Sequence, residues 1–333
     1  MLIATPNLCL DRTQFLTRIV PGAVMRAAHV EVTAGGKGVN IARVVRAFGG
    51  KAVLAGLVGQ EDRERLVGLL AEEGADLREV SAPGPVRMAI VMIEQEPGRV
   101  TIVNEPGSPV APEVWQRYAD EIDRNLPGQD LLICSGSLPP GAPPDAYGQL
   151  VEAAHRAGAL ALVDTAPAAL RAALASGPDL VAPNLQEAES ALAGTSGAVL
   201  ADADEDIPER AADAARALCA EGARAAAVTV GGDGIALARQ GSAAVQWIRT
   251  VPVDVVSAVG AGDSFLAGVA LSLQGQLPGP VDWRSAVLRG AATATASCEN
   301  LRAGGVDPAR VETLLARIEA TAGQDRSVTG GGS

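Results

Sequence analysis

The chain has 333 residues, 48% of them hydrophobic and 2% aromatic, so it can form one large α/β domain or two ordinary ones around a core of Leu, Val and Ala. Its net charge of −12 argues against a nucleic-acid-binding surface. The four cysteines are far apart, and the chain has neither a run of 18 apolar residues nor a secretory leader pattern. We therefore expect a soluble cytoplasmic protein with no zinc, nucleic-acid or membrane partner.

The first third of the chain predicts one buried strand and two hairpins. A strand over residues 2–5 is followed by a polar turn that carries Asn7 and Asp11. Residues 13–33 alternate between apolar and polar, and the extended runs 86–94 and 99–104 form a second alternating pair. We expect these segments, within about 12–34 and 86–104, to form a small β-sheet lid. A lid excludes water from a transfer site.

A glycine-rich loop around a lysine precedes the first predicted helix. The loop is Gly35-Gly36-Lys37-Gly38, and Lys37 is one of only two lysines in the chain. The helix is predicted from about residue 39 to Phe48, where Gly49-Gly50 stops it. This is not a Walker A loop, because Gly rather than Ser or Thr follows the lysine.

From residue 112 the pattern becomes a regular alternation of strands and helices. Strands are predicted at 130–134, 159–163, 179–182 and 225–230, in addition to 52–58, and helices at 61–73, 112–125, 145–157, 207–221, 282–300 and 307–320. This alternation predicts a mostly parallel sheet with helices on both faces, and ligands in such sheets bind at the carboxyl ends of the strands. We expect one domain over residues 1–320 and a disordered tail over 321–333.

Residues 254–270 carry the strongest candidate for a catalytic site. A β-branched run ends at Ser257, the turn Gly260-Ala261-Gly262 follows, and Asp263 opens an apolar helix. Free amides at a helix N-terminus attract phosphate, which a carboxylate would repel unless it takes a proton from an attacking hydroxyl. The pattern therefore indicates phosphoryl transfer with Asp263 as the base. The alternative is an ordinary helix start capped by Asp.

The chain resembles the PfkB (ribokinase-like) family of carbohydrate kinases over roughly residues 1–318. Both family signatures are present, as Gly35-Gly36-Lys37-Gly38-Val39-Asn40 and as Val259-Gly260-Ala261-Gly262-Asp263-Ser264-Phe265. The turn Gly136-Ser137-Leu138-Pro139-Pro140-Gly141 and the opening Thr5-Pro6-Asn7 are similar to the branch of 1-phosphofructokinases and tagatose-6-phosphate kinases. The resemblance implies a three-layer α/β/α sandwich with a small β-sheet lid.

The resemblance also implies roles for individual residues. Asp263 is expected to be the catalytic base, beside an anion hole formed by the amides of Gly260, Ala261 and Gly262. The other expected contacts are sugar binding by Asp11, Gly36 and Asn40; binding of the sugar's own phosphate by Lys37 and Arg87; binding of ATP phosphates by Asn184, Thr229, Gly231 and Gly234; and binding of Mg²⁺ by Glu187 through water.

These expectations leave several functions open. The leading one is an ATP-dependent kinase for fructose 1-phosphate, and the alternatives in the same class are tagatose 6-phosphate and fructose 6-phosphate. From another class, a catalytically silent sugar-binding or regulatory protein is an alternative, because fold does not fix function. Exposed lid strands often pair with a second subunit, so we expect a homodimer through the lid.

Overall fold

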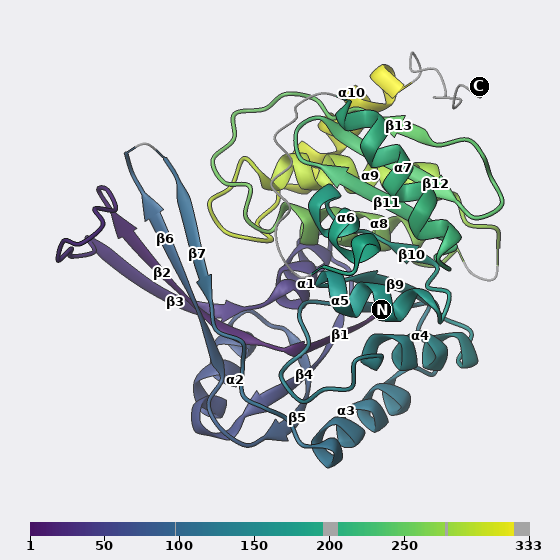
Figure 1. Cartoon of the computed structure of the whole chain (residues 1–333). Helices are drawn as coiled ribbons and strands as arrows, with labels where there is room; N and C mark the ends of the chain where they lie inside the picture. Colours follow the sequence, from purple (N-terminus) through teal and green to yellow (C-terminus); the bar gives the residue numbers. More distant parts are fainter. Residues whose placement is uncertain (97, 196–205, 277–278, 323–333) are drawn as a thin grey trace.

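A nine-stranded central sheet and a separate four-stranded sheet organise the chain (Figure 1). The computed structural model describes residues 1–96, 98–195, 206–276 and 279–322. The central sheet has the order β13-β12-β11-β10-β9-β8-β1-β4-β5. Its strands are β1 (Leu2–Asn7), β4 (Val53–Gly59), β5 (Asp76–Ala82), β8 (Leu131–Ser135), β9 (Leu160–Asp164), β10 (Leu180–Val181), β11 (Ala225–Val230), β12 (Gly234–Arg239) and β13 (Gln246–Ile248). All neighbouring pairs are parallel except β11–β12 and β12–β13.

Helices cover both faces of this sheet, and each face has its own apolar core. Along β1, Leu2 and Ala4 enter one core, whereas Ile3 enters the other. Successive strand residues point to opposite faces, so a run that is apolar throughout must be covered on both sides. One face carries α3 (Pro112–Asn125), α4 (Ala146–Arg156), α5 (Pro167–Leu174), α6 (Leu185–Ala193) and α7 (Ile207–Ala220). The other carries α1 (Lys37–Ala47), α2 (Arg63–Glu72), α8 (Ala261–Leu273), α9 (Trp283–Ser297) and α10 (Pro308–Ala322).

The four-stranded sheet projects from the side of the molecule (Figure 1). Its order is β3-β2-β6-β7, with strands β2 (Cys9–Leu16), β3 (His29–Gly35), β6 (Arg87–Glu94) and β7 (Val100–Asn104). The predicted α/β fold with a mostly parallel sheet and a small β-sheet lid is thus confirmed.

The structure corrects three expectations in detail. Asp11 does not lie in a turn after β1, because β2 begins at Cys9 and pairs along its length with β3 and β6. The β-branched residues before Ser257 form no strand, and the chain there bonds through the amide of Val256 to the carbonyl of Cys298. α10 continues to Ala322, so the first two residues of the expected tail are helical, and residues 323–333 lie outside the described residues.

Membrane insertion through a helix finds no support in the described part of the chain, where none of the helices combines the length and apolarity that a bilayer requires.

Candidate active site

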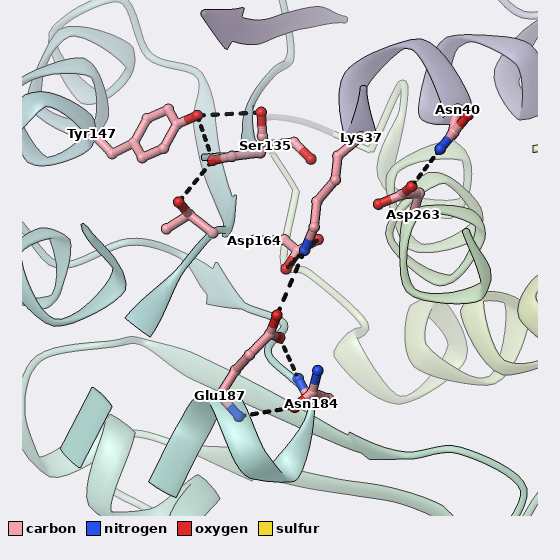
Figure 2. A network of polar contacts seen from close by, with 10 residues as sticks. Lys37, Asn40, Ser135, Tyr147, Asp164, Asn184, Glu187 and Asp263 are labelled. Atoms are coloured by element: carbon pink, nitrogen blue, oxygen red, sulfur yellow. Dashed lines mark hydrogen bonds and ion pairs between the residues drawn. The ribbon is translucent and has the colours of Figure 1, made fainter. Parts of the chain in front are cut away.

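Charged side chains from four elements meet at the carboxyl edge of the central sheet (Figure 2). Lys37 is the first residue of α1, Asp164 ends β9, Glu187 lies in the first turn of α6, and Asp263 lies in the first turn of α8. Parallel strands all end at this edge, so segments far apart in sequence are brought together there. The cluster combines three carboxylates with one ammonium group.

The N-terminus of α8 presents free amides beside Asp263. Gly260 is the N-cap residue with φ +78°, a left-handed conformation that favours glycine, and an added Cβ would meet the Ala303 side chain at 2.9 Å. The amide of Ala261 donates to the carbonyl of Ala258 at 3.2 Å. The amides of Gly260 and Gly262 donate no hydrogen bond to another described residue. Two of the three amides expected to form an anion hole therefore remain available to a ligand.

The carboxyl group of Asp263 is almost completely buried, with 5% of the residue exposed. The side-chain amide of Asn40 donates to its Oδ2 at 2.7 Å. Burial raises the pKa of Asp263 to about 7, because it disfavours the charged form, and Asp164 and Glu187 raise it further. Lys37 and the Asn40 hydrogen bond act in the opposite direction. The result is a carboxylate with the pKa that general base catalysis near neutral pH requires.

Lys37 lies within the acidic cluster. Its ammonium group donates to both carboxylate oxygens of Asp164, at 3.0 Å each, and Nζ lies 3.9 Å from Glu187 Oε1. Burial opposes the charged form, but Asp164, Asp263 and Glu187 together raise the pKa of Lys37 above its usual value. Lys37 is therefore a fixed cation within electrostatic reach of the candidate base.

The turn after β8 is hydrogen-bonded to the end of β9, next to this cluster. Gly136 has φ +97°, its amide donates to the carbonyl of Asp164 at 3.0 Å, and its carbonyl accepts from the hydroxyl groups of Thr165 at 2.8 Å and Tyr147 at 2.9 Å. These bonds join the end of β8 to the end of β9, so the position of the Asp164 carboxylate is set by the sheet itself.

Asp11 lies on the lid strand β2, and its carboxylate lies over the backbone of Gly35. A Cβ added to Gly35 would meet the carboxylate of Asp11, so a larger residue at this position would displace that side chain. The thiol of Cys9 donates to Asp11 Oδ1 at 3.1 Å. Burial raises the pKa of Asp11, whereas the Cys9 hydrogen bond and the nearby Arg43 and Arg87 charges lower it.

Arg87 begins β6 and does not join the Lys37 cluster. Its Nε donates to the carbonyl of Asn7 at 2.9 Å, and among the described residues it has no carboxylate within 4.0 Å. The side chain of Asn7 donates to Ser137 Oγ at 3.0 Å and to the carbonyl of Pro106 at 3.1 Å. Lys37 and Arg87 were expected to bind one phosphate together, but the structure gives them different partners.

The residues expected to bind ATP phosphates are joined by local structure. Asn184 caps α6: its Oδ1 accepts from the Glu187 amide at 2.8 Å, and Glu187 Oε2 accepts from the Asn184 amide at 3.0 Å. Asn184 also forms a parallel bridge with Thr229. Gly231 follows at φ +49°. Gly234 has a packing role, because an added Cβ would meet the Trp247 ring at 2.8 Å.

A cavity of about 290 Å³ lies between the lid, α1 and the loops near Gly260. Asp11 and Thr33 line it from the lid, Arg43 from α1, and Val259 and Ala303 from the two loops near Gly260. A larger cavity of about 980 Å³ lies along the other side of α1, lined by Arg46, Lys51, Glu72 and Asp76 among others. The smaller cavity reaches both Asp11 and the loop before Asp263.

Gly36 and Asn40 lie at the start of α1, between Asp11 and Asp263. Gly36 is the N-cap residue, with φ +112°, and Asn40 is buried against Asp263. Sequence reasoning missed the contacts of Asp164, Cys9 and Arg43. Asp164 was detectable as an acid at the end of a predicted parallel strand. Among the described residues, no three His, Cys, Asp or Glu side chains form a group that could hold a metal ion.

The chain is similar to known sugar kinases over most of its length. Residues 4–310 match the family described as pfkB family carbohydrate kinase. The chain is 32% identical over 273 residues to a 1-phosphofructokinase of Xanthomonas campestris pv. campestris, which covers 81% of this chain and 82% of that protein.

Two structures of phosphofructokinase-2 from Escherichia coli share its fold, each at 26% identity with a TM-score of 0.82. The structure in complex with fructose-6-phosphate matches over 96% of this chain and 99% of that chain. The tetrameric inhibited form matches over 96% of this chain and 98% of that chain.

Proposed function

Because the chain belongs to the pfkB family of carbohydrate kinases, we propose that it transfers the γ-phosphoryl group of ATP to O6 of fructose 1-phosphate, giving fructose 1,6-bisphosphate. The broader activity, phosphorylation of an alcohol group on a sugar phosphate, follows from the family and its relatives. The choice of sugar and the roles of individual residues are parts of the proposal.

The observation that carries the proposal is the pairing of Asp263 with the free amides of Gly260 and Gly262. A carboxylate with a pKa of about 7 accepts a proton readily at neutral pH. Amides at a helix N-terminus stabilise the negative charge of a phosphoryl group during its transfer. A purely anion-binding site gains nothing from a buried acid at this position, so the combination supports catalysis.

The transfer then proceeds in one displacement. Asp263 takes the proton of the acceptor hydroxyl as that oxygen forms a bond to the γ-phosphorus of ATP. The bond between the γ-phosphorus and the bridging oxygen breaks, and ADP leaves with that electron pair. The proton remains on Asp263 until it is released to solvent. In this scheme the amides of Gly260 and Gly262 hold the oxygens of the phosphoryl group in flight.

The surroundings of the two candidate cations support a division of labour between them. Lys37 lies 3.0 Å from Asp164 and within electrostatic reach of Asp263, so we assign it to the phosphoryl group being transferred. Arg87 donates a hydrogen bond through Nε to the carbonyl of Asn7 and has no carboxylate partner among the described residues. Its remaining N–H groups can therefore bind the phosphate already on the sugar. Asp11 would accept hydrogen bonds from sugar hydroxyls across the lid cavity.

The donor side would be formed by Asn184, Glu187, Thr229 and Gly231. The Glu187 side chain fits a water-mediated contact to Mg²⁺, because Oε1 accepts no hydrogen bond among the described residues while Oε2 is used in the helix cap. Bound Mg²⁺ would neutralise charge on the ATP phosphates. Gly234 is better explained by its packing against Trp247, although the same turn also carries Gly231.

A panel of acceptors tests the choice of sugar. We expect ADP release with fructose 1-phosphate at a kcat/KM at least about tenfold above that for fructose 6-phosphate or tagatose 6-phosphate. In those two sugars the phosphate is at a different position and would lose its contact with Arg87, and one such contact is worth more than about 1.4 kcal/mol. Replacing Arg87 with Met should raise KM for the phosphorylated sugar and leave weak activity on free fructose unchanged.

Preference for fructose 6-phosphate would favour the alternative that the phosphofructokinase-2 structures suggest. Turnover of ribose or adenosine alone would reject the sugar-phosphate proposal.

A further inference from the structure

Arg43 lies one helical turn after Asn40 on α1 and has a nearly complete set of partners. Its Nη1 donates to Asn40 Oδ1 at 2.8 Å, and its Nη2 donates to the carbonyl of Ala34 at 2.5 Å. Its Nε and Nη2 donate to the two carboxylate oxygens of Glu73, at 2.7 and 2.8 Å. Only 11% of the Arg43 side chain is exposed. The guanidinium group is therefore fixed in one orientation.

This orientation decides how the Asn40 side chain is turned. A side-chain amide has one oxygen that accepts and one nitrogen that donates. Because Arg43 is a donor only, it must face the oxygen, and the nitrogen is left to face Asp263 Oδ2 at 2.7 Å. A continuous series of hydrogen bonds thus runs from Glu73 through Arg43 and Asn40 to Asp263.

We propose that Arg43 is a positioning residue for catalysis, which acts through Asn40 to aim a hydrogen-bond donor at the carboxylate of Asp263. The inference rests on the proposed role of Asp263 as the base. Without Arg43, the Asn40 amide could rotate and present its oxygen to the carboxylate, which would repel the ionised form. With Arg43, the deprotonated base is favoured and is held in one place.

The other charges near these residues do not replace this contact. Lys37, Asp164 and Glu187 are the charged groups that act on Asp263, and none of them contacts Asn40 among the described residues. Next to Arg43, Glu73 Oε1 also forms an ion pair with Arg302 Nη2 at 2.6 Å. The charge of Arg43 also lowers the pKa of Asp11. Burial raises the pKa of Glu73, but the hydrogen bonds and charges of Arg43 and Arg302 lower it by more, so the pKa is below its usual value. Glu73 therefore stays ionised and keeps Arg43 in place.

Arg43 also has a structural role from which positioning must be separated. It bonds the loop at Ala303 and the end of β3, so its loss can loosen the packing around α1. Its positive charge could also act on Asp263 through space. Four single variants and one double variant distinguish these effects.

The first comparison is between Arg43→Met, Arg43→Lys and Arg46→Met. Arg46 lies one turn further along α1 and is exposed, so its replacement removes the same charge without touching Asn40. The readouts are the pKa of Asp263 by carbon-13 NMR of the ligand-free protein, the acid limb of the kcat/KM profile, and thermal unfolding.

We expect Arg43→Met to raise the pKa of Asp263 from about 7 to about 8 and to lower kcat/KM at pH 6.5 by about tenfold, mainly through kcat. Arg43→Lys should raise this pKa nearly as much, because an ammonium group cannot bond Glu73, Ala34 and Asn40 together. Arg46→Met should leave it unchanged. If the pKa of Asp263 in Arg43→Lys equals that in the wild-type chain, the proposal is overturned, because a positive charge at residue 43 would then be enough to set this pKa.

The second comparison repeats Arg43→Met in an Asn40→Ala background. If Arg43 acts through Asn40, it should have no further effect on the pKa of Asp263 there, whereas independent effects would add. Additive effects would overturn the proposal. Because NMR needs no substrate, a chain that phosphorylates none of the tested sugars but shows this coupling would contradict the proposed function and leave the positioning role intact.

Discussion

Because the carboxylate of Asp263 is buried, its ionisation as pH rises should increase activity and decrease stability. In the folded chain its pKa is raised to about 7, mainly by burial, whereas an exposed Asp titrates near 4. The unfolded chain therefore loses this proton more readily than the folded chain. Stability is highest when both forms are protonated and falls as pH rises from about 4 through about 7.

We predict that Asp263→Asn lowers kcat by about 10²–10⁴-fold or more, because the base is lost. The same variant should unfold at a temperature a few degrees higher at pH 8, because a buried charge has been removed, and this gain should shrink as the pH falls toward 5. ADP release and thermal unfolding across this pH range measure both effects.

Sugar binding by the Asp263→Asn variant is the control, and it should be near normal. Near-normal turnover would remove Asp263 from the mechanism and reopen the alternative of a silent sugar-binding protein.

Residues in short motifs could be singled out from the sequence, whereas their partners could not. Gly36, Lys37, Asn184 and Asp263 stand in short motifs that are visible in the sequence. The contact of Lys37 with Asp164 joins residues 127 positions apart, and no local pattern carries that information. The same holds for Asn40 and Asp263, which are 223 positions apart. The topology predicted which edge of the sheet holds the site, but only packing decided which side chains touch.

At the scale of elements, the inner parallel strands were predicted well because both of their faces are buried, whereas the partly exposed edge strand β5 was missed. β11 was expected at residues 225–230 and α3 at 112–125, as the structure has them. Four elements, β5, α5, β12 and β13, were not predicted. α5 begins at Pro167 and is only eight residues long, and β12 (Gly-Ile-Ala-Leu-Ala-Arg) is rich in alanine, which favours helix. In β12, pairing with β11 and β13 overrides local preference.

The cap of α6 separates structural and functional roles for Asn184. We predict that Asn184→Ala lowers the free energy of unfolding by about 1 kcal/mol, because the cap is lost. It should also raise KM for ATP several-fold with little change in KM for the sugar, because the proposed donor site includes this turn. Denaturant unfolding and initial-rate kinetics measure these effects.

Asp282→Ala is the matched control for the Asn184 variant. Asp282 is the N-cap of α9, with Oδ1 accepting from the Ser285 amide at 3.1 Å, and it is absent from the proposed site. Asp282→Ala should lower the free energy of unfolding by a similar amount and leave KM for ATP unchanged. If Asn184→Ala and Asp282→Ala have the same KM for ATP, Asn184 acts only as a helix cap.

At the scale of the whole molecule, the lid presents one face to the cavity and another to its surroundings. Asp11, Thr33, Val91 and Ile93 line the cavity side. Strand alternation and register place the row Val32, Arg12, Ile90 and Val103 on the opposite face, next to Val30 and Met92. Val30 and Val103 are 39% and 54% exposed. Apolar residues gathered on an open sheet face favour association with a second subunit.

We propose that two copies of this chain associate through the outer face of the lid, and we predict a dimer by light scattering at micromolar concentration. The double variant Val30→Asp/Val103→Asp should be monomeric, because it places charges on that face. Both residues face away from the cavity, so sugar binding within each subunit should persist. The pair Arg63→Asp/Arg65→Asp, on α2, changes surface charge elsewhere and should remain dimeric. A monomeric wild-type chain, or a dimeric lid variant, would place any interface on another surface.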